Sequence, residues 1–235
     1  MNKFIAFILI CISFVSCAKK PGSGATPARH GTKVERPQKV NNKEEKTPRK
    51  LMSGTEIFEK YNSAVFMIFT SDDNSSYQGS GFFISSDGLA VSNYHVFKGT
   101  YQGEEAIKLS GSNTKYNVTE VIHCDEDNDF IVFRVNTNNC KYIPIASKKP
   151  SVGEKVYAIG SPRGLENTFS SGEVSQWRDT NLIQINAQID HGSSGGALIN
   201  QYGEVVGITS GTFCDGSQAN LNYAWSIDVI KPYIK

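Results

Sequence analysis

The sequence reads Ile189-Asp190-His191-Gly192-Ser193-Ser194-Gly195-Gly196-Ala197-Leu198-Ile199-Asn200 near its C-terminal end. Glycines before and after the two serines let the backbone turn sharply and leave room for a carbonyl group to approach. This pattern presents a serine nucleophile on a tight turn, although many Gly- and Ser-rich segments are only turns. We therefore expect an oxyanion hole at Gly192, Ser193 and Ser194, with the amides of Gly192 and Ser194 as its donors.

Two partners for a serine nucleophile lie upstream of this turn. His95 follows an apolar run at residues 88–91, and Asp129 directly precedes another at residues 130–135. An imidazole accepts the serine proton near neutral pH, and a carboxylate fixes its tautomer and stabilises the imidazolium. The order His95, Asp129, Ser194 is the chymotrypsin-like order and differs from that of subtilisin or the α/β-hydrolases.

Further motifs match one family in register. They are Gly79-Ser80-Gly81-Phe82, Ser92-Asn93-Tyr94-His95-Val96, Asp129-Phe130-Ile131-Val132, Gly160-Ser161-Pro162, Ser171-Gly172-Glu173-Val174-Ser175 and Gly203-Glu204-Val205-Val206-Gly207-Ile208. With the turn around Ser194, they make residues 53–227 resemble the HtrA/Deg group of trypsin-like serine proteases. The resemblance implies that His95 is the general base, Asp129 its orienting carboxylate and Ser194 the nucleophile.

Many short runs of branched and aromatic residues, separated by Gly, Asn, Asp and Ser, predict an all-β domain. The resemblance implies two six-stranded antiparallel β-barrels, with short N- and C-terminal helices and the triad in the cleft between the barrels. We place the protease domain at residues 51–235, barrel one at about 62–143 and barrel two at about 151–228. A capping box at Ser53-Gly54-Thr55-Glu56 predicts a first helix that ends near Tyr61.

The sequence departs from the family at several positions. Ser193 replaces the usual Asn before the nucleophile, and Trp225-Ser226-Ile227-Asp228 replaces the usual Phe-Ala-Ile-Pro run. Many trypsin-like enzymes carry a serine that hydrogen-bonds the triad aspartate, so we expect the Ser226 hydroxyl to contact Asp129. The sequence ends at Lys235, and we therefore expect a bare protease domain without the PDZ domain of many family members.

The substrate pocket is expected between the strand before the nucleophile turn and the strand at residues 224–227. Its predicted lining residues are Gln188, Ile189, Ala224, Trp225 and Ser226. Gln188 stands six residues before Ser194, where trypsin-like enzymes that cut after basic residues carry an acidic side chain. A loop of altered length would bring Asp190 to that place. By the resemblance, we expect a small or medium apolar residue before the cut.

The first 17 residues predict an export signal, because Lys3 precedes an apolar run that is short for a membrane span. Phe14-Val15-Ser16-Cys17 resembles a bacterial lipobox, which would make Cys17 the lipidated first residue of a membrane-tethered lipoprotein. Ser16-Cys17-Ala18 also fits ordinary signal peptidase, which would release a soluble secreted enzyme. We favour lipidation and a place in the bacterial cell envelope, in the periplasm or at the outer membrane. The third alternative is that the segment is not cleaved and anchors the protein in the membrane.

The segment after Cys17 differs in charge from the rest of the chain. Residues 18–50 carry ten Lys and Arg and three Glu, whereas residues 51–235 carry thirteen basic and twenty acidic residues. With almost no branched or aromatic side chains, residues 18–50 predict a disordered basic linker. Because no aromatics interleave with the basic residues, we expect a solvated tether and no nucleic-acid binding. The second alternative is that the basic linker is attracted to anionic lipid head groups.

Three cysteines, Cys124, Cys140 and Cys214, lie in the predicted domain. In an oxidising compartment we expect one disulfide, for which Cys124–Cys140 is the closest pair in the sequence, or else three free thiols. The acidic residues 125–129 lack the spacing and glycine of a calcium loop, and the histidines lack metal-ligand spacing. We therefore expect no metal and no cofactor.

Together, these features predict a serine endopeptidase that cleaves exported or envelope proteins through an acyl-enzyme. A protease-like binding or chaperone module with a latent site is the alternative from another class. An esterase on the same triad is a further one. Nothing in the sequence specifies an oligomeric state.

Overall fold

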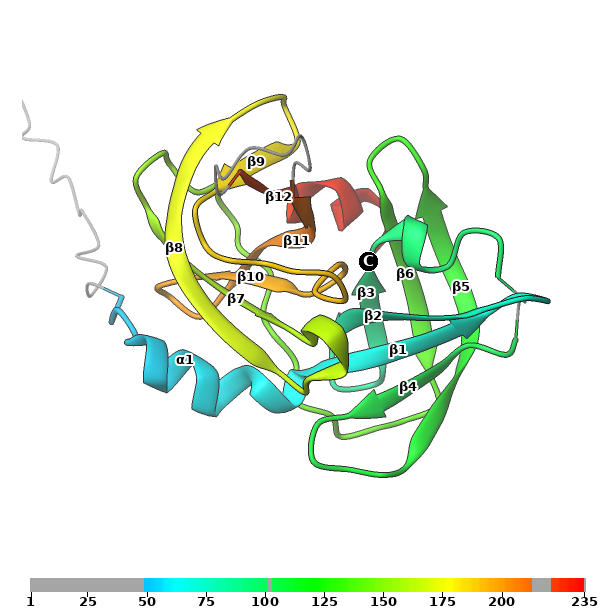
Figure 1. The fold of residues 1–235 in the computed structure, drawn as a ribbon. Helices are drawn as coiled ribbons and strands as arrows, with labels where there is room; N and C mark the ends of the chain where they lie inside the picture. The colour runs from blue at the N-terminus through cyan, green and yellow to red at the C-terminus, as the bar shows by residue number, and fades with distance from the viewer. Residues whose placement is uncertain (1–48, 101–102, 213–220, 235) are drawn as a thin grey trace, which may run out of the picture. The chain divides into compact units, whose positions relative to one another are not determined.

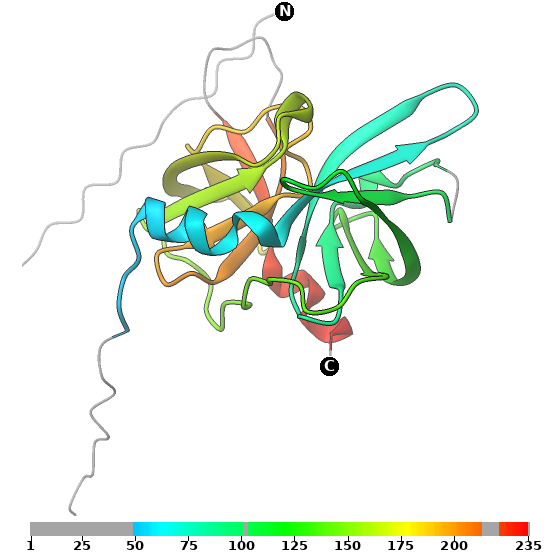
Figure 2. The same cartoon turned by 90° about the horizontal axis from the view of Figure 1, so that it is seen from below.

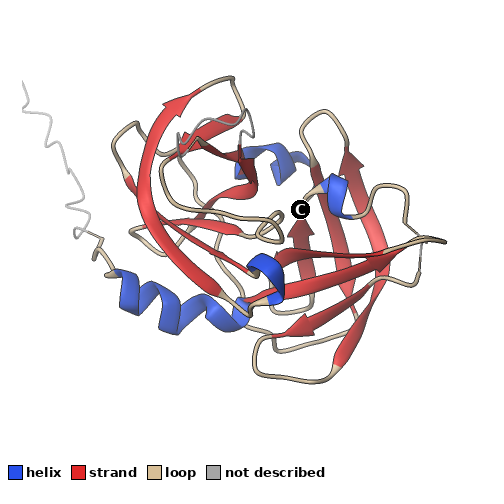
Figure 3. Ribbon diagram, viewed as in Figure 1, coloured by secondary structure: helices blue, strands red, loops and turns tan. Residues whose placement is uncertain are grey.

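The computed structural model describes residues 49–100, 103–212 and 221–234. The predicted export signal, Cys17 and all but the last two residues of the predicted linker lie outside the described residues. Strands dominate the described chain, as Figure 3 shows, and the prediction of an all-β domain is confirmed. Across the described ranges, no helix has the length and hydropathy needed to cross a membrane.

The chain enters the fold through the predicted capping box. The Ser53 hydroxyl accepts a hydrogen bond from the Glu56 amide (3.2 Å), and the Glu56 carboxylate accepts one from the Ser53 amide (2.7 Å). Helix α1 (Gly54–Tyr61) follows and buries Ile57 and Tyr61. In Figure 2, α1 lies along the second barrel, before the 3-10 helix η1 (Asn62–Ala64) leads into the first.

Six antiparallel strands form the first closed barrel, in the spatial order β1-β2-β3-β6-β5-β4 (Figure 1). Phe66, Phe83 and Phe133 fill its interior, with the rings of Phe66 and Phe83 4.7 Å apart. The strands are β1 (Val65–Ser71), β2 (Ser76–Phe83), β3 (Leu89–Ser92), β4 (Ala106–Leu109), β5 (Lys115–Asp125) and β6 (Phe130–Val135).

Six further strands form the second closed barrel, in the order β10-β11-β12-β9-β8-β7. Small and branched side chains such as Val156, Ile183 and Leu198 fill its interior. The strands are β7 (Lys155–Gly160), β8 (Thr168–Trp177), β9 (Leu182–Ile185), β10 (Ala197–Asn200), β11 (Val205–Thr212) and β12 (Asn222–Ser226). The predicted pair of six-stranded barrels is confirmed.

A shared apolar cluster joins the two barrels. It contains Phe130 of the first barrel, Ile159 of the second and Ile230 of the C-terminal 3-10 helix η4 (Ile227–Tyr233). At the end of η4, the Tyr233 ring stacks on His123 of β5 with 3.6 Å between ring centroids. Helix η4 thus follows the second barrel, and its residues pack against both barrels.

The predicted disulfide is wrong. Cys124 and Cys140 are free thiols, and Cys214 lies outside the described residues. The Cys140 thiol points at the backbone carbonyls of Ser85 (3.6 Å) and Ser86 (3.4 Å), whereas Cys124 is exposed on β5. Closeness in the sequence did not bring the two thiols together, because Cys124 pairs with Ile131 at one end of β6 and Cys140 lies at the β2–β3 turn, beyond the other end.

Candidate active site

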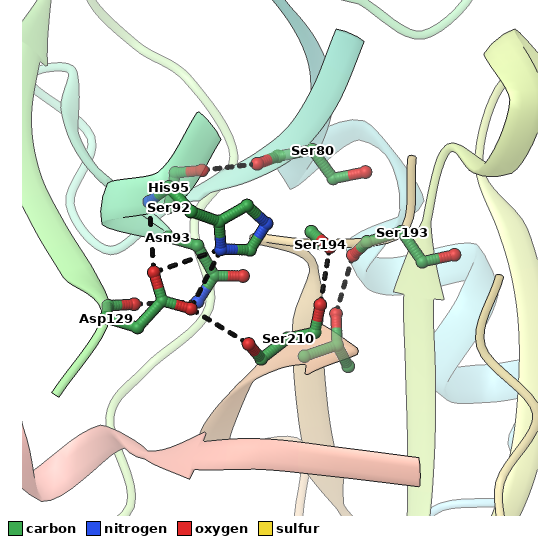
Figure 4. Close-up of polar contacts among 9 residues, drawn as sticks. Ser80, Ser92, Asn93, His95, Asp129, Ser193, Ser194 and Ser210 are labelled. Carbon is green, nitrogen blue, oxygen red and sulfur yellow. Dashed lines mark hydrogen bonds and ion pairs between the residues drawn. The ribbon is translucent and has the colours of Figure 1, made fainter. Parts of the chain in front are cut away.

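His95 lies on a short 3-10 helix, η2 (Tyr94–Val96), directly after β3. Its Nδ1 lies 3.0 Å from Asp129 Oδ1 and 2.9 Å from Asp129 Oδ2, and its amide donates to Oδ1 (3.0 Å; Figure 4). Because Nδ1 faces the carboxylate, Nε2 is left for a second partner. The His95 side chain is 47% exposed, so that nitrogen is accessible from the cleft.

Asp129 occupies the turn between β5 and β6 in a left-handed conformation with φ of 46°. Asp and Asn adopt this region more readily than other side-chain-bearing residues. The buried Asn93 supports the turn, because its Nδ2 donates to the Asp129 carbonyl (2.8 Å). The carboxylate is 16% exposed and is held toward His95.

Ser194 lies on the turn between β9 and β10, where Gly192 and Gly195 have φ of 93° and 87°. A side chain at Gly195 would collide with Ser80, since an added Cβ would lie 2.1 Å from the Ser80 carbonyl oxygen. The sequence rule that glycines permit this turn therefore holds at these two positions. Ser194 Oγ donates to the Ser210 carbonyl (2.5 Å), and within the described residues no hydrogen bond joins it to His95.

Ser210 links Ser194 to Asp129, as Figure 4 shows. Its carbonyl accepts the Ser194 hydroxyl, and its own hydroxyl donates to Asp129 Oδ2 (2.9 Å). The β11–β12 register shifts between Thr209 and Gly211, so Ser210 is the extra residue of a β-bulge. Bulges re-aim side chains next to active sites. The sequence interpretation missed this residue, and its signal is a serine followed by glycine inside a strand.

Two amides on the turn around Ser194 have no hydrogen-bond acceptor within the described part of the chain. Among the described residues, neither the Gly192 nor the Ser194 amide donates a hydrogen bond. The Ser193 amide donates to the Asp190 carbonyl (2.9 Å), which leaves the Gly192 and Ser194 amides as the candidate oxyanion donors. The Arg163 amide holds the His191 carbonyl (2.8 Å), and the Gly192 N–H on the same planar peptide points away from it.

A family model described as a trypsin-like peptidase domain matches residues 79–208, more than half of the chain. The chain belongs to the trypsin-like peptidase family.

Similar proteins include HtrA and DegP-like proteases. A probable periplasmic serine endoprotease, DegP-like, of Halomonas elongata is 36% identical over 160 residues, covering 64% of this chain and 33% of that protein. Protease Do-like 5, chloroplastic, of Arabidopsis thaliana is 32% identical over 188 residues (69% and 58%). The Drosophila virilis serine protease HTRA2, mitochondrial, is 30% identical over 182 residues (72% and 42%). The chain thus spans between a third and somewhat over half of the length of these relatives.

A solved structure shares the fold of this trypsin-like peptidase. The serine endoprotease from Yersinia pestis superposes with a TM-score of 0.69 at 26% identity, covering 77% of this chain and 65% of that one.

Ser226 does not make the contact that we expected in this peptidase. Its hydroxyl oxygen accepts a hydrogen bond from the Asp228 amide (3.3 Å) and caps η4, while Ser210 makes the contact to Asp129. Ser226 lies in the β12 ladder opposite Gly207 and is buried, so it does not face the cleft.

A cavity of ≈570 Å³ lies beside the nucleophile turn. Gln188 and Ile189, which we expected in the substrate pocket, are among its lining residues, together with Pro162, Leu165 and Phe169. Three predicted residues are not among the lining. Ala224 is buried in the second-barrel core, Ser226 caps η4, and Trp225 alternates to the other face of β12.

Asp190 lines the cavity but its charge is paired. Its carboxylate lies 2.7 Å from the guanidinium of Arg163, which also lines the cavity. The hydrogen bond from the His191 amide and, secondarily, the Arg163 guanidinium hold the pKa of Asp190 below its usual range. An ionised but paired carboxylate is a poor partner for a basic substrate side chain. Over the described ranges, no three His, Cys, Asp or Glu side chains converge to hold a metal ion.

Proposed function

We propose that this trypsin-like peptidase is a serine endopeptidase with His95, Asp129 and Ser194 as its catalytic residues. The observation that carries the proposal is the coupling of His95 Nδ1 to both Asp129 oxygens. It lies beside a serine turn with two amides that donate to none of the described residues. A carboxylate so placed fixes the imidazole tautomer and stabilises the imidazolium. Family membership supports the same reaction.

Ser194 Oγ would attack the substrate carbonyl while His95 Nε2 takes its proton. The Gly192 and Ser194 amides would then donate to the oxyanion, and each such donor lowers the barrier by about 3–4 kcal/mol. His95 returns the proton to the leaving amine, and water repeats the sequence on the acyl-enzyme.

One movement precedes attack. Ser194 Oγ now donates to the Ser210 carbonyl and must rotate toward Nε2. A rotation of this kind is common, because the hydrogen bonds between catalytic groups are often long or absent until substrate binds. The same contact favours the second candidate function, a latent or binding module in which the hydroxyl stays on Ser210.

The cavity beside the turn supports a small or medium apolar residue before the cut. Its lining includes the apolar residues Ile159, Phe169 and Ile189, and the ionised Asp190 carboxylate is paired with Arg163. Peptides that differ only in Val, Phe, Lys or Glu at this position test the assignment. Fastest cleavage after Val is expected, and a strong preference for Lys would contradict it.

We further propose that the substrates are exported or envelope proteins and that Cys17 carries a lipid anchor. One relative is named as periplasmic, and the export signal and lipobox pattern of this sequence point to the same compartment. In this proposal residues 18–50 are the linker and 51–235 the catalytic domain. Metabolic labelling with a palmitate analogue, compared with Cys17→Ser, tests the anchor, and equal labelling of the two would contradict it.

Labelling of the full chain with a fluorophosphonate tests the catalytic assignment. The probe should modify Ser194, and labelling should vanish in Ser194→Ala and His95→Ala. A folded wild-type protein that neither reacts with the probe nor cleaves peptides would favour the binding module.

A further inference from the structure

Ser80 of β2 hydrogen-bonds the turn around Ser194 from the first barrel, where Gln78 and Ser92 also lie close to the glycines of that turn. It is fully buried, and its hydroxyl donates to the Gly192 carbonyl (2.7 Å) and accepts from the Ser161 amide (2.8 Å). Its own amide donates to the Ser194 carbonyl (2.8 Å). Its carbonyl accepts the Ser92 hydroxyl (2.7 Å; Figure 4), so every polar atom of Ser80 is engaged.

These contacts act on the residue that carries one oxyanion donor. Because Gly192 has no side chain, its own φ and ψ angles are little restricted, and its orientation depends on the two peptide groups that flank it. The preceding peptide is fixed by the Arg163 amide on the His191 carbonyl, and the following one by the Ser80 hydroxyl on the Gly192 carbonyl. With either bond lost, Gly192 is free to rotate its N–H away from the substrate.

Ser80 also acts on the first of these bonds. Through the Ser161 amide it holds the turn at η3 (Pro162–Gly164), which carries Arg163. Gln78, two residues earlier on the same face of β2, holds the same turn, since its Nε2 donates to the Ser161 carbonyl (3.0 Å) and its Oε1 accepts from the Gly164 amide (3.0 Å). One strand of the first barrel therefore fixes both sides of Gly192.

We infer that Ser80 is a positioning residue that orients the Gly192 amide in the oxyanion hole through its hydroxyl. The inference rests on the proposed serine endopeptidase function for its effect on rate. Its effect on the turn itself is independent of that function. Ser80→Ala removes one oxygen atom and leaves the part-buried Gly192 carbonyl and the buried Ser161 amide without this partner.

Kinetics on the full chain give the first test. For Ser80→Ala we expect kcat to fall roughly 10- to 100-fold with KM within about threefold, because an oxyanion donor acts in the transition state. The affinity for a peptide boronate, whose tetrahedral adduct fills the oxyanion hole, should fall by the same factor. Rates are taken per folded molecule, so a loss of stability alone does not produce this pattern.

Ser92→Ala is the matched control. Ser92 is equally buried in the same barrel, but its hydroxyl bonds only within that barrel. It should keep kcat within about threefold of wild type, since the bonds of the Ser80 hydroxyl to the Gly192 carbonyl and the Ser161 amide remain. If Ser92→Ala and Ser80→Ala lose kcat equally, or if Ser80→Ala keeps full kcat, the inference is overturned.

Amide hydrogen exchange separates this inference from the proposed function. The amides of Ser161, Arg163 and Ser193 are hydrogen-bonded in the native turn, and in Ser80→Ala their exchange should accelerate roughly tenfold or more. Faster exchange in a protein whose wild type does not react with a fluorophosphonate would refute the function and keep the positioning role. Unchanged exchange would refute the positioning role, whatever the activity.

Discussion

Replacing Ser210 by alanine should slow the proposed reaction and leave the fold intact. The Asp129 carboxylate accepts from the His95 amide, from His95 Nδ1 and from the Ser210 hydroxyl. Ser210→Ala removes the last of these donors. The Ser210 carbonyl, which accepts the Ser194 hydroxyl, remains because it belongs to the backbone.

The magnitude follows from the charge and burial of the acceptor. A hydrogen bond to a charged group contributes about 1.5–3 kcal/mol. The Asp129 side chain is 16% exposed, so water replaces the lost donor in part and the lower half of that range applies. A loss of about 1.5–2 kcal/mol, felt when His95 becomes a cation, lowers kcat/KM roughly 10- to 30-fold.

The assay is cleavage of a fluorogenic peptide by wild type, Ser210→Ala, Ser210→Thr and Ser226→Ala. Ser210→Thr keeps the hydroxyl and should recover most of the rate. Ser226→Ala removes the cap of η4, so it should cost about 0.5–1 kcal/mol of stability and leave the rate within about twofold. Full activity in Ser210→Ala, or a larger loss in Ser226→Ala, would refute the assignment of the two serines.

Three further outcomes are expected. Gly195→Ala should abolish fluorophosphonate labelling, because the added Cβ would lie 2.1 Å from the Ser80 carbonyl oxygen and the turn would have to move. Labelling at the wild-type rate would contradict this turn geometry. The Ser53 amide and, next, the Lys50 ammonium hold the pKa of Glu56 at about 2, below the ordinary value near 4.5. Glu56 therefore stabilises the fold above about pH 4.5, and the Tm advantage of wild type over Glu56→Gln should shrink as the pH falls from 6 to 3, as thermal unfolding would measure. Iodoacetamide should modify Cys124 faster than Cys140, whose pKa is raised by burial, in a mass-spectrometric time course; equal rates would contradict the burial of Cys140.

The sequence predicted the fold because its signals are local. The Ser53–Glu56 capping box, the short branched runs and the glycine turn at residues 192–196 each act over a few residues. Such patterns survive in the folded chain when no tertiary contact opposes them. The two barrels then follow from twelve such strands and the family resemblance.

The errors concern contacts between distant segments. The serine beside Asp129 was sought at Ser226, but a bulge in β11 places Ser210 there. A bulge adds one residue to a strand, so the side chains beyond it change faces. The in–out alternation of a regular strand does not predict this change. The predicted Cys124–Cys140 disulfide is wrong for a related reason. A disulfide depends on the distance and direction of the two side chains in the fold and not on their separation in the sequence.

The site depends on the junction of the two barrels more than on either barrel alone. The first barrel supplies His95 and Asp129, and the second supplies Ser194 on a turn whose glycines restrict it little. Contacts run in both directions, because Ser210 reaches from the second barrel to Asp129 and Ser80 reaches from the first to Gly192. A shift of one barrel relative to the other would therefore disturb the proposed acid–base pair and the proposed oxyanion donors together.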